Sequence, residues 1–565
     1  MRAALLLSVL LPLPLIAQEN IAEEKLSAVK APDYTYEKSP VFLVEQGAVD
    51  IEAAGKVTAY ADSIFLLEKS VLHHITPVVT KTGKLKAVVV SKYSLTPPQG
   101  DIVYVDGKHV WVSAASGEGT SEQLVPLCRM EVEADKKSQG GARVAALEVL
   151  KKPAGGIDLP GEEPKAVAHA EGTLYVLDAK GVKLIPLTAR AEKVSGIPAP
   201  SPEVADITYD EPRGWFWAVV PKRKILCAFD GNGVVVVVKR LKYEPVGIAS
   251  SGGSIWVVDA TGKKLHNYRY REDVAYELEA ALEATVRFEV GGAPGCVALP
   301  WQLPHQKILE GGRIKLSPKA PMKKDNWGQR YARFGGGGWV EVRAKIYRMT
   351  YNIVPGRCRG FDAIPRKLHR AYTKDGKMLK MESQEVQEAA KEVRALLERW
   401  RATKGAGVKK TPYWLARAAY EWLVRKIHYK RVPGWVDAPT ILKRGFGTCS
   451  PISFAFVAVC RALKVPARFM AGTRWRRKDP SYDREFHRWC EVYIPPYGWV
   501  PVDPSSAGKD PTPLSAAVHW GYLPETDLVM TLGGGGSDVF GWAYNAAGPR
   551  AQALWSNIKK EENAR

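Results

Sequence analysis

Residues 445–463 read GFGTCSPISFAFVAVCRAL, a glycine-rich turn that runs into a long apolar stretch. Pro451 suits the first turn of a helix, and a stretch that is apolar on nearly every side predicts a buried helix. Cys449 then lies at the amino end of that helix, where unsatisfied N–H groups and the positive end of the helix dipole stabilise a thiolate. Cys449 is therefore the candidate nucleophile.

A second cysteine, Cys460, follows eleven residues later. At a rise of about 1.5 Å per residue, it lies roughly 16 Å from Cys449 along the helix axis. Bridged Cα atoms lie within about 7 Å of each other, so a continuous helix excludes a Cys449–Cys460 disulfide. We interpret Cys460 as a core residue.

Two strand-like runs follow the helix after a basic loop. They read EFHRWCEVYI at 485–494 and WVPVD at 499–503, and a turn with two prolines and a glycine separates them. This order is typical of an antiparallel hairpin. Alternation places His487 and Trp489 on one face and Cys490 on the other, so Cys490 is not expected to reach the site.

The hairpin brings a histidine and a carboxylate together. His487 and Asp503 are direct cross-strand neighbours only if residues 492–498 form the whole loop. A tighter turn predicts a bulge that brings them together.

In their order, these segments resemble the core of the transglutaminase-like superfamily. The resemblance rests on the Gly-x-Cys turn at Cys449, LKVPAR at 463–468, HRWCE at 487–491 and GWVPVDP at 498–504. It covers about residues 345–510. It implies a papain-like α+β fold in which the cysteine helix packs on the sheet that carries the histidine and the aspartate.

The resemblance also implies a catalytic triad of Cys449, His487 and Asp503. Cys449 attacks a carboxamide and forms a thioester, His487 pairs with the thiolate and transfers protons, and Asp503 orients His487. The implied activity is acyl transfer at amide bonds of a peptide or protein substrate, as a peptidase, an amidase or a transamidase. No metal and no cofactor is expected.

The remaining oxyanion donor has two candidates. The backbone N–H of Cys449 supplies one donor, and by comparison with the animal enzymes Trp435 or Tyr429 supplies another, with plain packing as the alternative for either. Thr448 stands where the animal enzymes carry glutamine, which leaves transamidation open, and their calcium dependence is not carried over.

A basic loop follows the predicted helix. Arg474 and Arg476, with Trp489 nearby, are candidate substrate-binding residues for an acidic substrate. A solvated loop is the alternative.

Upstream, an aromatic residue that marks a strand recurs at a period of about 40 residues, which is typical of a β-propeller blade. The clearest copies centre on Tyr175, Trp217 and Trp256, and weaker ones on Phe65 and Trp111. The sequence thus indicates five candidate blades and leaves closure of the ring open. A pair of β-sandwiches is the alternative.

These patterns predict a multidomain chain with an all-β, propeller-like N-terminal domain and an α+β, transglutaminase-like C-terminal domain. Ser383 is expected to cap one helix of the latter, and Thr411 with Pro412 to start another. The predicted segments are a signal peptide at 1–17, a propeller-like domain at 35–290, a connector at 291–340, a transglutaminase-like domain at 341–545 and a helical or loosely ordered tail at 546–565.

The first residues predict export. Arg2 precedes an apolar stretch from Ala3 to Ile16, and Ala17 is followed by polar residues, an order typical of a signal peptide. No later stretch reaches the roughly 20 apolar residues of a spanning helix. We expect a secreted or periplasmic protein with no membrane span once the signal is removed; an uncleaved anchor is the alternative.

The formal net charge is +21. It favours anionic surroundings such as an envelope component, whereas no motif indicates nucleic-acid binding. Seven cysteines leave at least one thiol outside any intramolecular pairing. The alternative to an enzyme is a non-catalytic binding or scaffold protein whose propeller recognises an envelope or protein partner.

Overall fold

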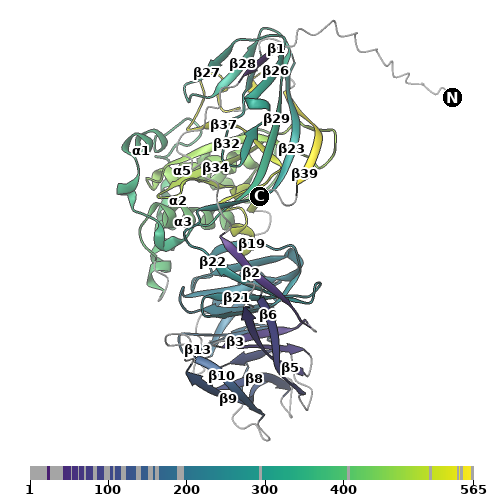
Figure 1. The fold of residues 1–565 in the computed structure, drawn as a ribbon. Helices are drawn as coiled ribbons and strands as arrows, with labels where there is room; N and C mark the ends of the chain where they lie inside the picture. The colour runs from purple at the N-terminus through teal and green to yellow at the C-terminus, as the bar shows by residue number, and fades with distance from the viewer. Residues whose placement is uncertain are drawn as a thin grey trace, which may run out of the picture.

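Figure 1 shows the fold of the computed structural model. The predicted signal peptide at 1–17 lies outside the residues that the structure describes. Those residues are 22–25, 42–51, 54–60, 63–68, 71–79, 85–94, 102–105, 108–115, 122–134, 142–149, 157–159, 164–187, 196–291, 295–403, 408–507, 512–543, 546–547 and 551–561.

Four antiparallel sheets follow one another in the N-terminal part of the described chain, each built from strands consecutive in sequence. In each of them the second strand carries one of the marker aromatic residues, because this strand is sheltered between its neighbours. The strands are β3 Lys56–Tyr60, β4 Ser63–Glu68, β5 Val71–Val79 and β6 Leu85–Ser94; β7 Val103–Val105, β8 His109–Ala115, β9 Glu122–Ala134, β10 Ala142–Val149 and β11 Ile157–Asp158; β12 Ala166–Ala170, β13 Thr173–Leu177, β14 Lys183–Leu187 and β15 Ile197–Pro198; β16 Asp206–Asp210, β17 Trp215–Val220, β18 Ile225–Phe229 and β19 Val235–Arg240.

A fifth sheet joins the two ends of this region. Strands β20 (Pro245–Ser251), β21 (Ser254–Asp259) and β22 (Lys264–Tyr270) are completed by β2 (Leu43–Asp50), which pairs with β22. The first strands contact one another all the way round, from β3 through β7, β12 and β16 to β20 and back to β3. The five candidate blades are therefore confirmed as sheets, and the ring is closed.

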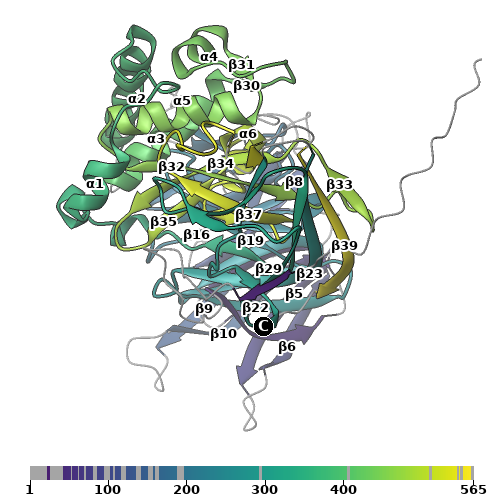
Figure 2. The same cartoon turned by 90° about the horizontal axis from the view of Figure 1, so that it is seen from above.

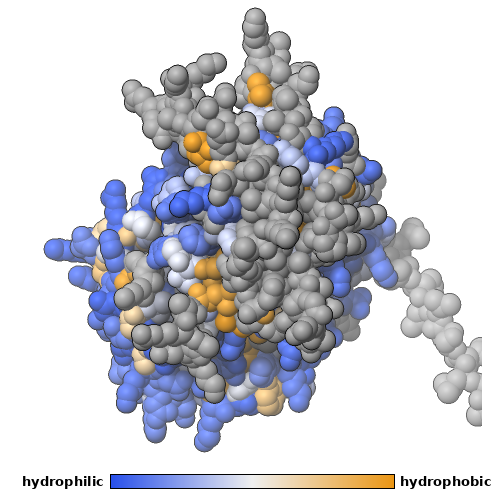
Figure 3. Space-filling model, turned by 90° about the horizontal axis from the view of Figure 1, so that it is seen from below, coloured by the Kyte–Doolittle hydropathy of each residue, from blue (hydrophilic) through white to orange (hydrophobic). Residues whose placement is uncertain are grey.

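The first strands of the five blades enclose a cavity of about 500 Å³. Tyr104, His169, Thr208 and Ser250 are among the polar residues that line it. Seen from below, the described surface of the propeller is mostly hydrophilic, with hydrophobic residues in small separate groups (Figure 3). Polar groups thus dominate both the channel and this outer face.

The predicted connector and tail both contribute to a β-sandwich. In the larger sheet, the order is β1-β26-β29-β23-β39-β33, with β25 and β36 also paired to β29; the smaller sheet is β27-β28-β24-β38. Buried side chains of both sheets form one hydrophobic cluster. The strands are β1 Ala22–Lys25, β23 Tyr276–Val290, β24 Gly295–Ala298, β25 Gln306–Ile308, β26 Arg313–Ser317, β27 Met322–Lys324, β28 Arg330–Phe334, β29 Gly338–Tyr351, β33 Ser481–Asp483, β36 Tyr522–Leu523, β38 Ala546–Ala547 and β39 Gln552–Glu561.

The prediction of a helical or loose tail was wrong for residues 552–561. They form strand β39, which pairs with β23 far upstream in the sequence. Ala553 and Trp555 alternate with more exposed neighbours and are fully buried. The local sequence does not reveal this strand, because a distant partner decides its conformation.

The C-terminal α+β domain places its helices on one face of a four-stranded sheet, β35-β34-β32-β37 (Figure 2). Ser383 and Thr411 cap α2 and α3 as predicted, and the buried helix α5 begins at Cys449. None of the described helices is both long and apolar enough to cross a membrane. The elements are α1 Arg366–Tyr372, α2 Gln384–Ala402, α3 Pro412–Lys426, α4 Ala438–Arg444, α5 Cys449–Ala462, α6 Pro504–Ala507, α7 Pro513–Ala517, β30 His428–Tyr429, β31 Phe446–Gly447, β32 Ala467–Arg474, β34 His487–Ile494, β35 Gly498–Val502 and β37 Asp527–Gly533.

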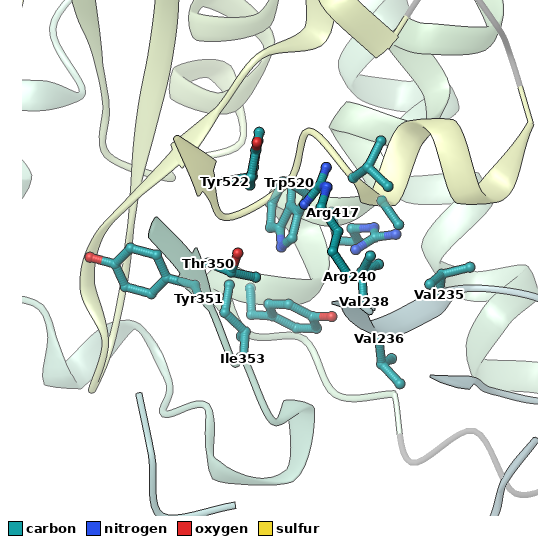
Figure 4. Close-up of a pocket in the computed structure, with 13 residues that line it drawn as sticks. Val235, Val236, Val238, Arg240, Thr350, Tyr351, Ile353, Arg417, Trp520 and Tyr522 are labelled. Atoms are coloured by element: carbon teal, nitrogen blue, oxygen red, sulfur yellow. The ribbon is translucent and has the colours of Figure 1, made fainter. Parts of the chain in front are cut away.

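Strand β19 of the fourth blade meets the C-terminal α+β domain at the junction shown in Figure 4. Arg240 lies over the ring of Tyr522, 4.2 Å from its centroid. The neighbouring Lys239 pairs with Glu277 and Glu279 of β23 at 2.6 and 2.5 Å. The propeller, the sandwich and the C-terminal α+β domain are therefore joined by direct contacts.

Candidate active site

The local fold places Cys449 at the start of helix α5, which packs on strands β34 and β32. Strand β31 pairs in parallel with β30, which sets Tyr429 opposite Gly447, two residues before the cysteine. The chain then turns into α5, whose first residue is Cys449. Its side chain is half-buried, whereas every later residue of the helix is buried. The thiol thus lies where the free N–H groups of a helix start point outward.

His487 is the first residue of strand β34 and faces the thiol. Its Nε2 lies 2.8 Å from Oδ2 of Asp503, and the ring also hydrogen-bonds the Cys449 thiol. Trp489 stacks on the imidazole with ring centroids 5.4 Å apart. The preceding residue, Phe486, has a φ of 48°, a strained value for a bulky side chain of the kind that clusters at functional sites.

The strand register differs from both alternatives considered for the hairpin. Cys490 pairs with Val502 and Ile494 with Gly498, so the turn is tight, and the pairing continues without a bulge. A bulge is unnecessary because β35 ends before Asp503, and the chain turns into α6 there. The aspartate therefore reaches His487 diagonally across the end of the sheet.

Asp503 is held by hydrogen bonds from the residues that follow it. The hydroxyls of Ser505 and Ser506 each donate to a carboxylate oxygen at 2.7 Å, and both backbone N–H groups donate to Oδ1 at 3.1 Å. The Asp503 N–H donates to the carbonyl of His519 at 3.0 Å. Asp503 thus caps the short helix α6 while it faces His487.

The three groups shift one another's pKa. Burial alone raises the pKa of Cys449, but the hydrogen bond and charge of His487, with the N–H of Arg488, lower it to about 7. Burial disfavours the imidazolium, yet Asp503 raises the pKa of His487 to about 9. Burial also opposes the Asp503 carboxylate, but His487 keeps the pKa of this carboxyl well below its usual range. A thiolate–imidazolium pair is therefore favoured between about pH 7 and 9.

The opposite face of β34 packs on helix α5. Cys490 is fully buried there and donates to the Ser453 carbonyl at 3.7 Å, so it does not reach the site, as the alternation predicted. Arg488 lies on the same face, 3% exposed, with its guanidinium over the rings of Trp435 and Phe454. Its positive charge also lowers the pKa of Cys449.

The two candidate oxyanion donors lie in different surroundings. Burial and the charge of Cys449 raise the pKa of Tyr429. Trp435 is 48% exposed and stacks on Arg488. Tyr429 is the candidate whose electrostatic coupling to the thiol is evident.

Of the candidate substrate-binding residues, Arg474 and Trp489 line one cavity, and Arg476 does not. Arg474 is bound to Asp527 through two hydrogen bonds at 2.7 and 2.5 Å and lines a cavity with Trp489. Arg476 instead pairs with the buried Asp483 at 2.6 Å and is not among the residues that line this cavity.

Sequence reasoning missed the groups that support the triad. Ser505, Ser506, Arg488 and His519 all act on Asp503 or Cys449. The two serines had a local signal, because an aspartate followed by Pro-Ser-Ser is a helix-start pattern. Arg488 and His519 had none, since only the tertiary fold brings them to the site.

Six cysteines whose side chains the structure describes are free thiols: Cys227, Cys296, Cys358, Cys449, Cys460 and Cys490. Helix α5 is continuous between Cys449 and Cys460, as expected. The described residues contain no group of three metal-binding side chains.

Comparison with known proteins identifies the superfamily of one segment of the chain. Among solved structures, the chain is similar to a candidate cysteine protease from Cytophaga hutchinsonii (14% identity, TM-score 0.33, 51% of this chain and 91% of that one). It is also similar to glutaminyl cyclase from Myxococcus xanthus (12%, 0.28, 42% and 99%) and BamB from Moraxella catarrhalis (9%, 0.24, 41% and 98%). No curated protein matches the sequence. The family profile of the transglutaminase-like superfamily matches residues 401–504, which include Cys449, His487 and Asp503, so this segment is a transglutaminase-like core.

Proposed function

We propose that the protein is a cysteine-dependent enzyme that cleaves or transfers amide bonds of peptides or proteins through a thioester on Cys449. The observation that carries this proposal is the hydrogen-bonded row of Cys449, His487 and Asp503, with the cysteine at the amino end of α5. A cysteine with only a structural role has no need of a histidine and an aspartate that are hydrogen-bonded in line with it. The match to a superfamily whose members are usually catalytic supports it.

The reaction follows from the protonation states. The Cys449 thiolate attacks the carbonyl carbon, and the carbonyl π electrons move onto the oxygen. As the tetrahedral intermediate collapses, the C–N bond breaks, and the His487 imidazolium gives its proton to the leaving nitrogen. The neutral imidazole then takes a proton from water or an amine, which attacks the thioester and releases Cys449. Asp503 keeps the imidazole oriented throughout.

The developing oxyanion needs donors that are already in place. The backbone N–H of Cys449 is one, because it belongs to the free first turn of α5. We assign the second to the Tyr429 hydroxyl, since its strand pairs beside Gly447 and its pKa responds to the charge of Cys449.

The propeller is proposed to recruit the substrate or an anionic envelope component, outside the cytoplasm. The closed ring with its cavity of about 500 Å³ supports a binding role, and the +21 charge favours an anionic partner. The signal-like residues 1–17 support export. A scaffold protein whose propeller alone is functional is the competing proposal, favoured only by this cavity.

The decisive experiment is the pH dependence of Cys449 alkylation by iodoacetamide, followed by mass spectrometry of the peptide that contains Cys449. We expect the rate to rise with an inflection near pH 7, below the value of about 8.5 for a free cysteine. In His487→Ala the inflection moves above 8.5, because burial then acts without the imidazolium.

The other described cysteines provide the internal control, since buried Cys460 and Cys490 resist alkylation in the same sample. If Cys449 alkylation in the wild type has the inflection of a free cysteine, and His487→Ala does not change it, the proposed enzyme is refuted and the scaffold proposal remains. Adding a primary amine to an acyl-transfer assay then separates transamidation from hydrolysis by the product formed.

A further inference from the structure

A cavity of about 230 Å³ lies directly beside the triad. Asp503 and Ser506 form part of its lining, and so does Trp489, whose ring stacks on His487. Pockets that enclose a whole drug-sized ligand measure about 300–1,000 Å³. This cavity is therefore suited to one residue-sized group of a substrate whose reacting bond lies at Cys449.

The charges that line the cavity leave one cation uncompensated. Arg474 is neutralised by Asp527, and the Asp503 carboxylate faces the imidazolium of His487. No carboxylate among the described residues pairs with the guanidinium of Arg477. A planar guanidinium binds a carboxylate through two parallel hydrogen bonds. The cavity is therefore complementary to one negative charge.

The loop that carries Arg477 is fixed on both sides. The Trp475 N–H donates to the Thr526 carbonyl at 2.9 Å, and its indole N–H donates to the Lys478 carbonyl at 2.7 Å. Asp479 accepts a hydrogen bond from Ile558 of β39 at 2.9 Å.

Arg477 itself has a φ of 62°. This left-handed backbone is unfavourable for a residue with a long side chain and points to a functional constraint. The residue with this strained backbone is thus the same one whose guanidinium lines the cavity without a carboxylate partner in the described chain.

The rest of the wall is largely apolar. Trp475, Trp489, Leu523 and Pro524 line the same cavity as Arg477 and Asp503. Such a wall suits methylene groups, and burying them favours binding. The complementary group is thus an aliphatic chain that ends in a carboxylate.

We propose that this cavity is a substrate subsite that binds a carboxylate on an aliphatic chain, carried by the residue that adjoins the amide attacked by Cys449. The inference rests on the proposed function and specifies its substrate class. An acidic side chain and a terminal carboxylate offer the same chemistry, and the experiment below separates them.

The test uses activated esters, which acylate the thiol without knowledge of the natural substrate. Mono-p-nitrophenyl glutarate is compared with neutral p-nitrophenyl butyrate, and the burst of p-nitrophenol gives the acylation rate constant of each. We expect the glutarate ester to react at least about tenfold faster, as one charge-assisted pair provides. Arg477→Gln brings the ratio close to one, and Arg477→Lys restores part of it.

Arg484→Gln is the matched control, since Arg484 is also an exposed arginine, directly after strand β33, but does not line the cavity. It keeps the wild-type ratio. A reactive Cys449 with no preference for the anionic ester, or a preference that survives Arg477→Gln, overturns the subsite alone. A Cys449 that neither ester acylates overturns the proposed function and the subsite together.

Competition identifies the source of the carboxylate. N-acetylglutamate α-amide carries only the side-chain carboxylate, N-acetylglutamine only the terminal one, and N-acetylglutamine amide neither. Slowing of acylation by the first assigns an acidic side chain, and slowing by the second assigns a chain terminus. Equal slowing by all three overturns the proposal.

Discussion

Two cysteines of helix α5, Cys449 and Cys460, can be compared directly. Cys449 begins α5 and Cys460 lies near its carboxyl end, yet they differ in every property that matters for reactivity. The pKa of Cys449 is lowered to about 7 by His487 and Arg488 despite burial, whereas burial and the neighbouring Cys490 raise the pKa of Cys460 well above its usual value. The difference shows that position and partners, more than residue type, make a nucleophile.

The largest expected effect on acyl transfer comes from replacing Cys449, and replacing Cys460 serves as the comparison. Cys449→Ser lowers acyl transfer by about 10⁴-fold or more, because a hydroxyl is a far weaker nucleophile without a matched base. Cys460→Ala leaves acyl transfer within about twofold, since the site is distant. It lowers the free energy of unfolding by about 1 kcal/mol instead. Burst kinetics and urea unfolding measure the two quantities, and a loss of turnover in Cys460→Ala contradicts the comparison.

The second-largest effect is expected from removing the Asp503 carboxylate that pairs with the His487 imidazole. Asp503 raises the pKa of His487, which burial would otherwise lower. In Asp503→Asn the pKa of His487 therefore falls from about 9, and the alkaline limb of the pH–rate profile moves to lower pH. Turnover falls by about 10³–10⁴-fold, as expected when the histidine loses its orienting carboxylate.

A profile of kcat/KM between pH 5 and 10 checks this shift. Asp483→Asn is the matched control, because Asp483 is also a buried, arginine-bound carboxylate, but neither it nor its partner Arg476 lines the cavity beside Asp503. An alkaline limb that stays near pH 9 in Asp503→Asn contradicts the assigned role.

A third variant tests whether the Tyr429 hydroxyl is the oxyanion donor at the amino end of α5. Tyr429→Phe removes one hydroxyl and is expected to lower the acylation rate by about 10²-fold, as the loss of one oxyanion donor does. The alkylation inflection of Cys449 stays near pH 7, because alkylation forms no oxyanion. Trp435→Phe is the control, and a larger loss in that variant transfers the donor role to Trp435.

The buried helix that begins at Cys449 and the hairpin that carries His487 were predictable because their signals are local. The Gly-x-Cys turn, the apolar run and the hairpin each specify a conformation within a few residues. The marker aromatics at Phe65, Trp111, Tyr175, Trp217 and Trp256 revealed five blades for the same reason.

What failed depends on distant contacts. Strand β39 forms because β23 offers an edge hundreds of residues away, and the diagonal contact of Asp503 with His487 depends on where β35 ends. The cavity beside Arg477 is built from four separate segments of the chain. No pattern within a short window contains such information.

The smallest effect lies farthest from the thiol, where the propeller supports the triad. Helix α7 places Leu514 and Ala517 in the hydrophobic cluster of the propeller, and the Leu514 N–H donates to the Pro200 carbonyl at 2.8 Å. The same segment continues to His519, whose carbonyl accepts the Asp503 N–H. A contact of the propeller thus extends to the catalytic carboxylate.

Leu514→Ala is therefore expected to loosen Asp503 and lower turnover by about three- to tenfold, within the range of known couplings between sites. Leu184→Ala is the matched control, because Leu184 is fully buried in the same cluster but belongs to blade strand β14. Both variants lose stability through a cavity of similar chemistry, by about 2–5 kcal/mol, so they are compared at a temperature where circular dichroism shows both folded. A shift of the alkaline limb in Leu514→Ala that Leu184→Ala lacks identifies positioning of the triad. Equal losses in the two variants show that the propeller acts on stability alone.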